Sequence, residues 1–271
     1  MTRIADRLAA SQPRSWLFAP GHNQKLLNRV FEADADAVML DLEDAVPASM
    51  KATARAMVVE VAATRTCWVR INRSRTAECE LDVAALAGLV AGFRLPKVES
   101  ADDVQWVASL APGVLIDCTI ESARGVHAAF DIASAPACSS LSYGGLDLAN
   151  DLGIQPGDQE TLFARSSIVI SARAANKPQP SDGVYPLIRD DSGLEAEARA
   201  AKRLGFFGKS AIHPRQIPII NQVFSPAPEE LEWAAQVIVA FEASGGAATA
   251  LESGEFVDKP VADRARRLLG S

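Results

Sequence analysis

The chain has 271 residues, 48% of which are apolar, and its formal net charge at pH 7 is −7. This length and apolar content suit one large α/β barrel as well as two smaller domains. The negative charge argues against a nucleic acid as the main partner, so any anionic ligand would have to meet local basic residues.

Short apolar segments rich in β-forming residues alternate along the chain with longer amphipathic segments. In chain order, strands are predicted at residues 15–19, 37–42, 67–71, 92–95, 114–119, 139–143, 180–184 and 206–209. Helices are predicted at 24–32, 52–63, 80–88, 101–110, 123–133, 161–175 and 194–204. This alternation predicts an α/β fold of the (β/α)₈ TIM-barrel type, with a doubly wound open sheet as the alternative.

Polar residues at the ends of the predicted strands favour the barrel over the open sheet. They include Asp41, Arg70, Lys97, Glu121 and Asp147. An open sheet concentrates such residues at one switch point, whereas a barrel builds one site from the loops that follow many strands. We therefore predict a site at the carboxyl ends of the strands.

The alternating pattern ends after Phe224. We predict a catalytic barrel domain over residues 1–224 and a C-terminal helical extension over residues 225–271. The extension is predicted to contain helices at 231–243 and 261–269, with a flexible break at 245–248. A barrel does not need this segment, so we expect it to pack on the mouth of a barrel, either its own or a neighbour's.

The four cysteines show no metal-binding spacing, and the apolar surroundings of Cys67 and Cys118 predict buried free thiols. Such thiols indicate a reducing compartment. The first six residues are too polar for a signal peptide, and no apolar run approaches membrane-spanning length. We therefore expect a soluble cytoplasmic protein.

Glu121 and Asp147 each follow a short apolar run that is predicted to be a buried strand. Two carboxylates that meet at a barrel mouth suit Mg²⁺, which takes one or two protein carboxylates and completes its coordination with water and substrate oxygens. Taken singly, Glu121 is explained equally well as a helix cap and Asp147 as a helix start. Their matching positions favour the metal site.

Arg70 ends the third predicted strand, where a buried guanidinium needs an anionic partner. That partner is either a carboxylate of the segment 41–44 or the carboxylate of a substrate, and we favour the substrate. Glu43 and Asp44 are predicted to orient the water around the metal. The alternative for this acidic segment is a solvated turn closed by Pro47.

Other signals for a site are weaker. The Pro20–Gly21 turn, followed by Lys25, is a candidate for phosphate binding at a helix N-terminus. Lys97, just beyond a buried strand, is a similar candidate, and His213 before a proline is expected to be a structural hydrogen-bonding residue. The chain has no P-loop, GxGxxG motif or Ser-His-Asp arrangement, which argues against the common kinase, dehydrogenase and hydrolase classes.

Seven segments, in order along nearly the whole chain, resemble the citrate lyase β-subunit-like proteins of the malyl-CoA lyase and HpcH/HpaI aldolase superfamily. They are residues 14–21, 37–46, 69–72, 95–98, 120–125, 147–153 and 209–214. The resemblance implies a Mg²⁺-dependent barrel enzyme of the oxo-acid-lyase type, with a CoA thioester as its substrate. It also implies a homo-oligomer, specifically a homotrimer.

The resemblance implies roles for individual residues. Glu121 and Asp147 would bind Mg²⁺, and Arg70 would hold the carboxylate of the 2-keto acid together with the backbone at Gly145, Leu146 and Asp147. Asp258 would enter the neighbouring subunit's site and protonate the acetyl-CoA enolate, which completes a catalytic set of Asp258, Arg70, Glu43 and Asp44. The CoA contacts would be Ser15, Pro20, Lys25 and Lys97, although many relatives carry an arginine shortly after the Pro-Gly turn where this chain has His22-Asn23-Gln24.

These signals together predict a lyase that cleaves citramalyl-CoA or malyl-CoA to acetyl-CoA and a 2-keto acid. One alternative is the β subunit of a multi-chain citrate lyase, which releases oxaloacetate and needs acyl-carrier partners. A second is a pyruvate-dependent class II aldolase that acts without CoA, and a third is a barrel that serves only as a scaffold.

Overall fold

The computed structural model describes residues 12–157 and 159–270. The polar segment 1–6, on which the expectation about targeting rests, lies outside the described residues. Within the described part, no helix is both long enough and apolar enough to cross a membrane. The chain divides into two compact units, with the boundary between Phe224 and Ser225.

Eight parallel strands form the centre of the first unit. They are β1 (Ser15–Pro20), β2 (Ala37–Asp41), β3 (Trp68–Arg70), β4 (Gly92–Leu95), β5 (Ile116–Ile120), β6 (Cys138–Tyr143), β7 (Asp182–Val184) and β8 (Lys209–Ala211). Hydrogen bonds join them in the order β6-β5-β4-β3-β2-β1-β8-β7. Each strand lies near its predicted position.

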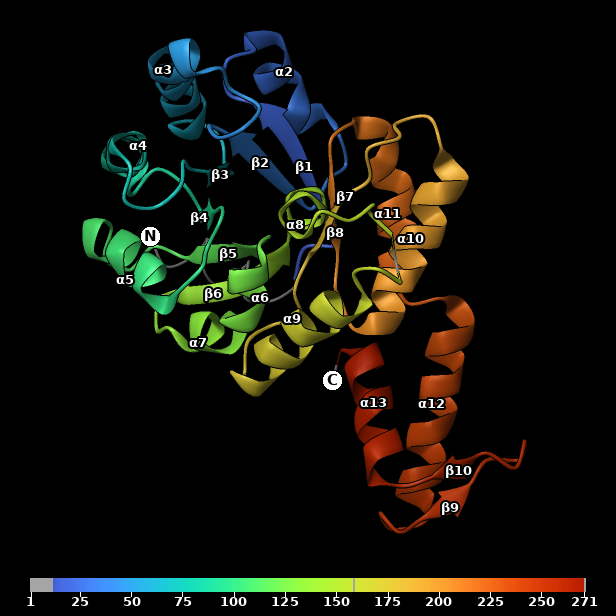
Figure 1. The fold of residues 1–271 in the computed structure, drawn as a ribbon. Helices are drawn as coiled ribbons and strands as arrows, with labels where there is room; N and C mark the ends of the chain where they lie inside the picture. The colour runs from blue at the N-terminus through green and yellow to red at the C-terminus, as the bar shows by residue number, and fades with distance from the viewer. Residues whose placement is uncertain (1–11, 158, 271) are drawn as a thin grey trace. The chain divides into compact units, whose positions relative to one another are not determined.

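The two end strands of this sheet, β6 and β7, are also joined. A parallel bridge links Ser142 to Ser181. The Tyr143 N–H donates to the Ser181 carbonyl at 2.9 Å, and the Ser181 N–H donates to the Leu141 carbonyl at 3.1 Å. The sheet is therefore closed into a barrel with helices around it (Figure 1), which confirms the predicted (β/α)₈ fold and excludes the open sheet.

Helices follow the strands, and most of them cover the outside of the barrel (Figure 1). They are α2 (Gln24–Arg29), α3 (Lys51–Ala62), α4 (Ala77–Leu86), α5 (Ala101–Leu110), α6 (Ala123–His127), α7 (Ala129–Ser134), α8 (Gly145–Leu152), α9 (Leu162–Ala174), α10 (Asp191–Leu204) and α11 (Ile217–Phe224). Short 3₁₀ turns lie at η1 (Val30–Glu32), η2 (Ala48–Met50) and η3 (Pro214–Gln216). The single helix predicted at 123–133 is divided at Ala128 into α6 and α7, and α8 and α11 were not predicted.

Strand β8 begins three residues later than its predicted start, and Gly208 explains the difference. Gly208 has a φ of +87°, a conformation outside the strand region, so the strand starts at Lys209. Phe206 is buried before this turn, with its ring centroid 6.3 Å from that of Tyr143. The apolar pair at 206–207 therefore packs beside the barrel rather than within its sheet.

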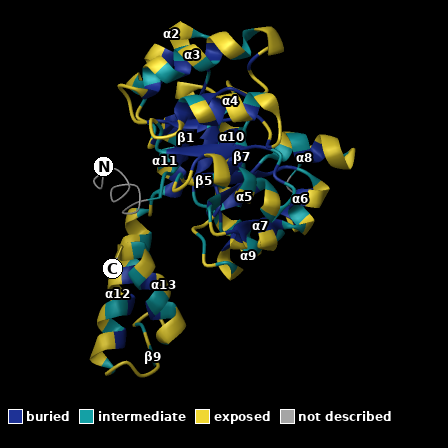
Figure 2. Ribbon diagram, turned by 90° about the vertical axis from the view of Figure 1, so that its left-hand side faces the viewer, coloured by how far each residue is buried: buried dark blue, intermediate teal, exposed yellow. Residues whose placement is uncertain are grey.

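Side chains along the strands alternate between the barrel interior and the layer under the helices. On β5, Ile116 and Ile120 belong to the apolar core of the first unit, whereas Asp117 binds Arg94 of β4. Arg94 also reaches Ser210 on β8, which is not a neighbour of β4, so these polar side chains meet inside the barrel. Figure 2 shows the barrel strands mostly buried and the outer faces of the helices exposed.

The four cysteines are buried and free, which confirms the prediction for Cys67 and Cys118. Burial raises the pKa of the Cys67 thiol to about 12, so this sulfur carries no charge at neutral pH. These cysteines are core residues rather than nucleophiles.

The second unit contains α12 (Pro228–Ala243), β9 (Thr249–Ala250), β10 (Phe256–Val257) and α13 (Lys259–Leu269). Both predicted helices are present, and the segment between them forms an antiparallel pair of short strands that was not predicted. Gly245 and Gly246 follow α12 with positive φ angles. The unit has its own apolar core, formed by Ala234, Val237, Phe241, Val257, Ala262 and Ala265.

Candidate active site

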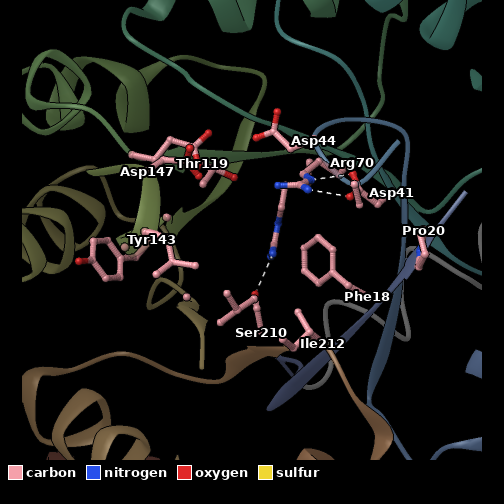
Figure 3. Close-up of a pocket in the computed structure, with 18 residues that line it drawn as sticks. Phe18, Pro20, Asp41, Asp44, Arg70, Thr119, Tyr143, Asp147, Ser210 and Ile212 are labelled. Carbon is pink, nitrogen blue, oxygen red and sulfur yellow. Dashed lines mark hydrogen bonds and ion pairs between the residues drawn. The ribbon is translucent and has the colours of Figure 1, made fainter. Parts of the chain in front are cut away.

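A pocket of about 390 Å³ lies at the carboxyl ends of the barrel strands. The described residues that line it come from all eight strands or the loops that follow them: Phe18, Pro20, Asp41, Asp44, Ala45, Arg70, Arg94, Thr119, Glu121, Tyr143, Gly144, Gly145, Leu146, Asp147, Gly183, Val184, Ser210 and Ile212. In Figure 3, Asp147 and Thr119 lie on one side and Asp41 and Pro20 on the other, with Arg70 between them. The pocket therefore lies at the carboxyl ends of the strands, where the sequence predicts a site.

Glu121 and Asp147 both line this pocket. Glu121 follows β5 and is only 5% exposed, and Asp147 lies in the first turn of α8. Burial, and then the negative charge of Asp147, raise the pKa of Glu121 to about 7. The two carboxylates are therefore close enough to repel each other, and a cation between them would relieve that repulsion.

The donor set at this position fits Mg²⁺. No group of three or more His, Cys, Asp or Glu side chains suited to a metal occurs in the described part of the chain. A pair of carboxylates without histidine or thiolate is typical of Mg²⁺, which leaves its other positions to water and substrate oxygens. Glu121 and Asp147 are the residues that would hold it.

The backbone fixes the position of the Glu121 carboxylate. Its Oε1 accepts a hydrogen bond from the Lys97 N–H at 2.6 Å. Its Oε2 lies over Gly144, where an added Cβ would come within 2.3 Å of that oxygen. Gly144 therefore has to lack a side chain, because any other residue would displace the carboxylate.

Arg70 has a protein partner. Its Nε and Nη2 bind Asp41 Oδ1 and Oδ2 at 2.8 and 2.7 Å, and its Nη1 lies 3.3 Å from Glu43 Oε2. Burial disfavours the charge of the guanidinium, but these carboxylates more than offset that effect and raise the pKa of Arg70. The structural partner left open by the sequence is therefore present, and a contact between Arg70 and a substrate stays a prediction.

Glu43 and Asp44 form an ionic cluster with Lys97. The Lys97 Nζ binds Glu43 Oε1 and lies 2.8 and 3.0 Å from the two Asp44 oxygens. Burial raises the pKa of Glu43, although Arg70 and Lys97 act against it. The alternative of a solvated turn does not describe Glu43, which is only 5% exposed, whereas Asp44 remains accessible at the pocket.

Arg94 is a pocket residue that sequence reasoning missed. Its Nε binds Asp117 at 2.6 Å, and its two terminal nitrogens bind Ser210 and Ser181 at 3.1 and 3.2 Å. The guanidinium also lies 5.6 Å from the Phe18 ring centroid. An arginine inside a predicted buried strand was the available signal, because it requires a buried anion.

Other pocket residues were missed as well. Thr119 lies on β5 two residues before Glu121, which follows this strand, so the two-residue period of extended chain was sufficient to find it. Val184 and Ile212, which end or follow β7 and β8, give no chemical signal in the sequence.

The predicted CoA contacts do not share one site. Pro20 lines the pocket and Lys25 is exposed on α2. Ser15 is fully buried at the amino end of β1, where its Oγ accepts the Asp36 N–H at 3.1 Å. The structure does not bring Ser15 to the pocket, and we do not retain it as a CoA contact.

Two further predicted residues begin helices. Asp258 caps the N-terminus of α13, where its Oδ1 accepts the Val261 N–H at 3.2 Å. His213 starts η3, where its Nδ1 accepts the Arg215 N–H at 3.1 Å, as expected for a structural hydrogen-bonding residue.

Residues 14–214 match the HpcH/HpaI aldolase/citrate lyase family. The chain is 37% identical to a (3S)-malyl-CoA thioesterase of Cereibacter sphaeroides, over 94% of this chain and 93% of that protein. It is 36% identical to the citrate lyase subunit beta of Escherichia coli, over 94% and 92% of the two chains. The crystal structure of the protein CitE from Mycobacterium tuberculosis in complex with magnesium, acetoacetate and coenzyme A aligns with a TM-score of 0.82 at 34% identity, covering 94% of this chain and 96% of that one.

Proposed function

Since the chain belongs to the HpcH/HpaI aldolase/citrate lyase family, we propose that it is a Mg²⁺-dependent lyase that cleaves a 3-hydroxyacyl-CoA to acetyl-CoA and a 2-keto acid. The observation that carries this proposal is the pair Glu121 and Asp147 in one pocket with Arg70. The related CitE structure, which contains magnesium, acetoacetate and coenzyme A, supports it.

Glu121, Asp147 and Arg70 each have a role in this reaction. Breaking the bond between C2 and C3 of the substrate releases the proton of the C3 hydroxyl to solvent, turns this hydroxyl into a carbonyl and leaves an enolate on the thioester. When bound, Mg²⁺ supplies a positive charge that stabilises the developing negative charge on the substrate oxygen. Glu121 and Asp147 would hold and orient this ion, and Arg70 adds positive charge in the same pocket.

The first turn of α8 supplies further donors. The N–H groups of Gly145, Leu146 and Asp147 are at the start of the helix, where they have no partner within it. The N-terminus of a helix favours a negative charge. These groups and Arg70 together bind the carboxylate of the keto acid, and they hold it at a fixed distance from the bond that breaks.

The assay that tests the proposal uses the purified chain alone with malyl-CoA, citramalyl-CoA and citryl-CoA. We expect Mg²⁺-dependent release of the keto acid, measured as its phenylhydrazone, with acetyl-CoA as the second product. EDTA should abolish the reaction and added Mg²⁺ should restore it. Keto acid release that EDTA does not affect would contradict the metal site, and release of pyruvate from a CoA-free substrate would indicate the aldolase instead.

A second candidate function is hydrolysis of the thioester, because the chain is 37% identical to a (3S)-malyl-CoA thioesterase. The same assay separates the two reactions. Hydrolysis of malyl-CoA releases free CoA thiol, which a disulfide dye detects, together with malate and without keto acid. Activity only after addition of acyl-carrier partners would favour a citrate lyase subunit, to which the chain is 36% identical.

Asp258 is proposed to protonate the enolate carbon in a neighbouring subunit of a homotrimer. Asp258→Asn is expected to lower kcat by roughly 10²–10⁴-fold, because the amide cannot donate a proton as an acid does. Stability should change little, since asparagine caps a helix N-terminus as well as aspartate does. Steady-state kinetics and the melting temperature together measure the two effects.

Mixed assemblies test whether Asp258 acts across subunits. Co-expression of the Asp258→Asn and Glu121→Gln chains should give activity that neither variant has alone, because one chain supplies an intact pocket and the other an intact Asp258. If the mixture stays inactive while each homo-oligomer is folded, the residue does not act in a neighbour.

A further inference from the structure

Lys97 has a backbone conformation that its side chain does not favour. It lies two residues beyond β4 and has a φ of 53°, in the left-handed region. Among the described residues, Arg75 and Asn176 are the other non-glycine residues with positive φ. A Cβ disfavours this conformation, so the surroundings of such a residue must hold it there.

The Lys97 N–H points at the Glu121 carboxylate. The N–H donates to Oε1 at 2.6 Å. Among residues 12–157 and 159–270, no other hydrogen-bond donor to this carboxylate is found. The other oxygen, Oε2, lies against Gly144. One oxygen is therefore fixed by a hydrogen bond, and Oε2 remains available for an ion in the pocket.

The side chain of Lys97 holds this backbone in place. Its Nζ binds Glu43 and Asp44 in the loop after β2, which lies on the far side of β3 from Lys97. Glu43 is buried, and its own amide and Oε2 are already bound to Asp41 and Asp44. The ammonium is thus anchored to a fixed point, and this anchor opposes relaxation of the backbone to an ordinary φ.

We propose that Lys97 is a positioning residue of the Mg²⁺ site, which aims its backbone N–H at Glu121 while its ammonium, bound to Glu43 and Asp44, maintains the left-handed conformation. This inference rests on the proposed function, because it concerns the ion held by Glu121 and Asp147. It replaces the CoA contact that the sequence predicted for the Lys97 side chain.

The test compares Lys97→Ala with Lys97→Gly by calorimetric titration of Mg²⁺ into the full-length protein. Alanine loses the ammonium and still disfavours the left-handed backbone, so the Kd for Mg²⁺ should rise by roughly tenfold. Glycine also loses the ammonium but adopts this backbone freely and keeps the N–H, so the Kd should rise by no more than about threefold. An equal loss in both variants would overturn the inference, because the backbone conformation would then have no part in Mg²⁺ binding, and no loss in either would overturn it as well.

Arg75 provides a matched control, because it has a φ of 61° and is exposed on another loop. Arg75→Ala and Arg75→Gly should differ in melting temperature as the Lys97 pair does, yet leave the Kd for Mg²⁺ unchanged. If Lys97→Ala does not fold, Lys97→Met keeps the aliphatic part of the side chain and takes its place. If the unaltered protein itself binds no Mg²⁺, the proposed function and this inference fail together, whereas binding by both the unaltered protein and Lys97→Ala with equal Kd removes only the inference.

Discussion

Glu121→Gln should make the metal-free protein more stable at pH 8 while it lowers the lyase rate by roughly 10³-fold. The rate falls because a ligand of the ion is lost, and stabilisation of the developing oxygen charge is worth several kcal/mol. The stability rises because the amide has the same shape as the carboxylate, still accepts the Lys97 N–H, and carries no charge.

The pH dependence of this gain in stability follows from the pKa of Glu121. Burial and Asp147 raise it from 4.5 to about 7. A raised pKa in the folded state means that the favourable contribution of the protonated group is complete below pH 4.5 and is lost as the pH rises through 7. Above pH 7 the buried charge costs on the order of 3 kcal/mol, and Glu121→Gln removes this cost.

Urea unfolding in EDTA at pH 5 and pH 8 measures this difference. The stability gained by the variant should be small at pH 5 and largest at pH 8, and Mg²⁺ should stabilise only the unaltered protein. Glu80→Gln, at an exposed position on α4, is the matched control and should show no such gain. If the variant is no more stable than the unaltered protein at pH 8, the surroundings of Glu121 do not disfavour its ionised form.

Asp117→Asn should lower the free energy of unfolding by about 3–5 kcal/mol, the usual cost of removing one partner of a buried ion pair. Asp117 and Arg94 are 1% and 3% exposed, and the Arg94 Nε lies 2.6 Å from Asp117 Oδ2. Because a guanidinium does not lose its proton at accessible pH, the variant leaves an uncompensated positive charge inside the barrel. The remaining partners of Arg94, Ser181 and Ser210, are neutral.

Chemical denaturation of single and double variants measures this pair. Adding Arg94→Met to Asp117→Asn removes the unpaired charge and should recover most of the lost stability. Asp131→Asn, at an exposed position on α7, should change stability by no more than about 0.5 kcal/mol. If Asp117→Asn is as stable as this control, water or another anion compensates Arg94.

The sequence predicted those parts of the fold and site that depend on local pattern. Apolar runs of strand length located the barrel, and the acids directly after two of them, Glu121 and Asp147, located the pocket. The helix α8 was missed because Gly144 and Gly145 are typical of a loop, although here Gly144 is required by its contact with Glu121.

Pairing between residues on different strands, and local backbone conformation, could not be predicted fully from the sequence. Arg94 and Asp117 are 23 residues apart, and their pairing depends on the register between β4 and β5. For Arg70 the sequence offered a carboxylate of the segment 41–44 as one of two partners, and only the position of Arg70 opposite Asp41 across β2 and β3 identified it. Nothing in a lysine side chain indicates positive φ, so the conformation of Lys97 became apparent only in three dimensions.

The contacts of Glu121 bear on how new substrate preferences arise in such a barrel. The backbone N–H of Lys97 and the absence of a side chain at Gly144 fix the position of the Glu121 carboxylate. Substitutions of other pocket residues leave both features in place. Val184 and Ile212 can therefore be enlarged or reduced in size, and the cavity reshaped around a different acyl group, while the acid keeps its place. Selection can then act on substrate choice separately from bond cleavage.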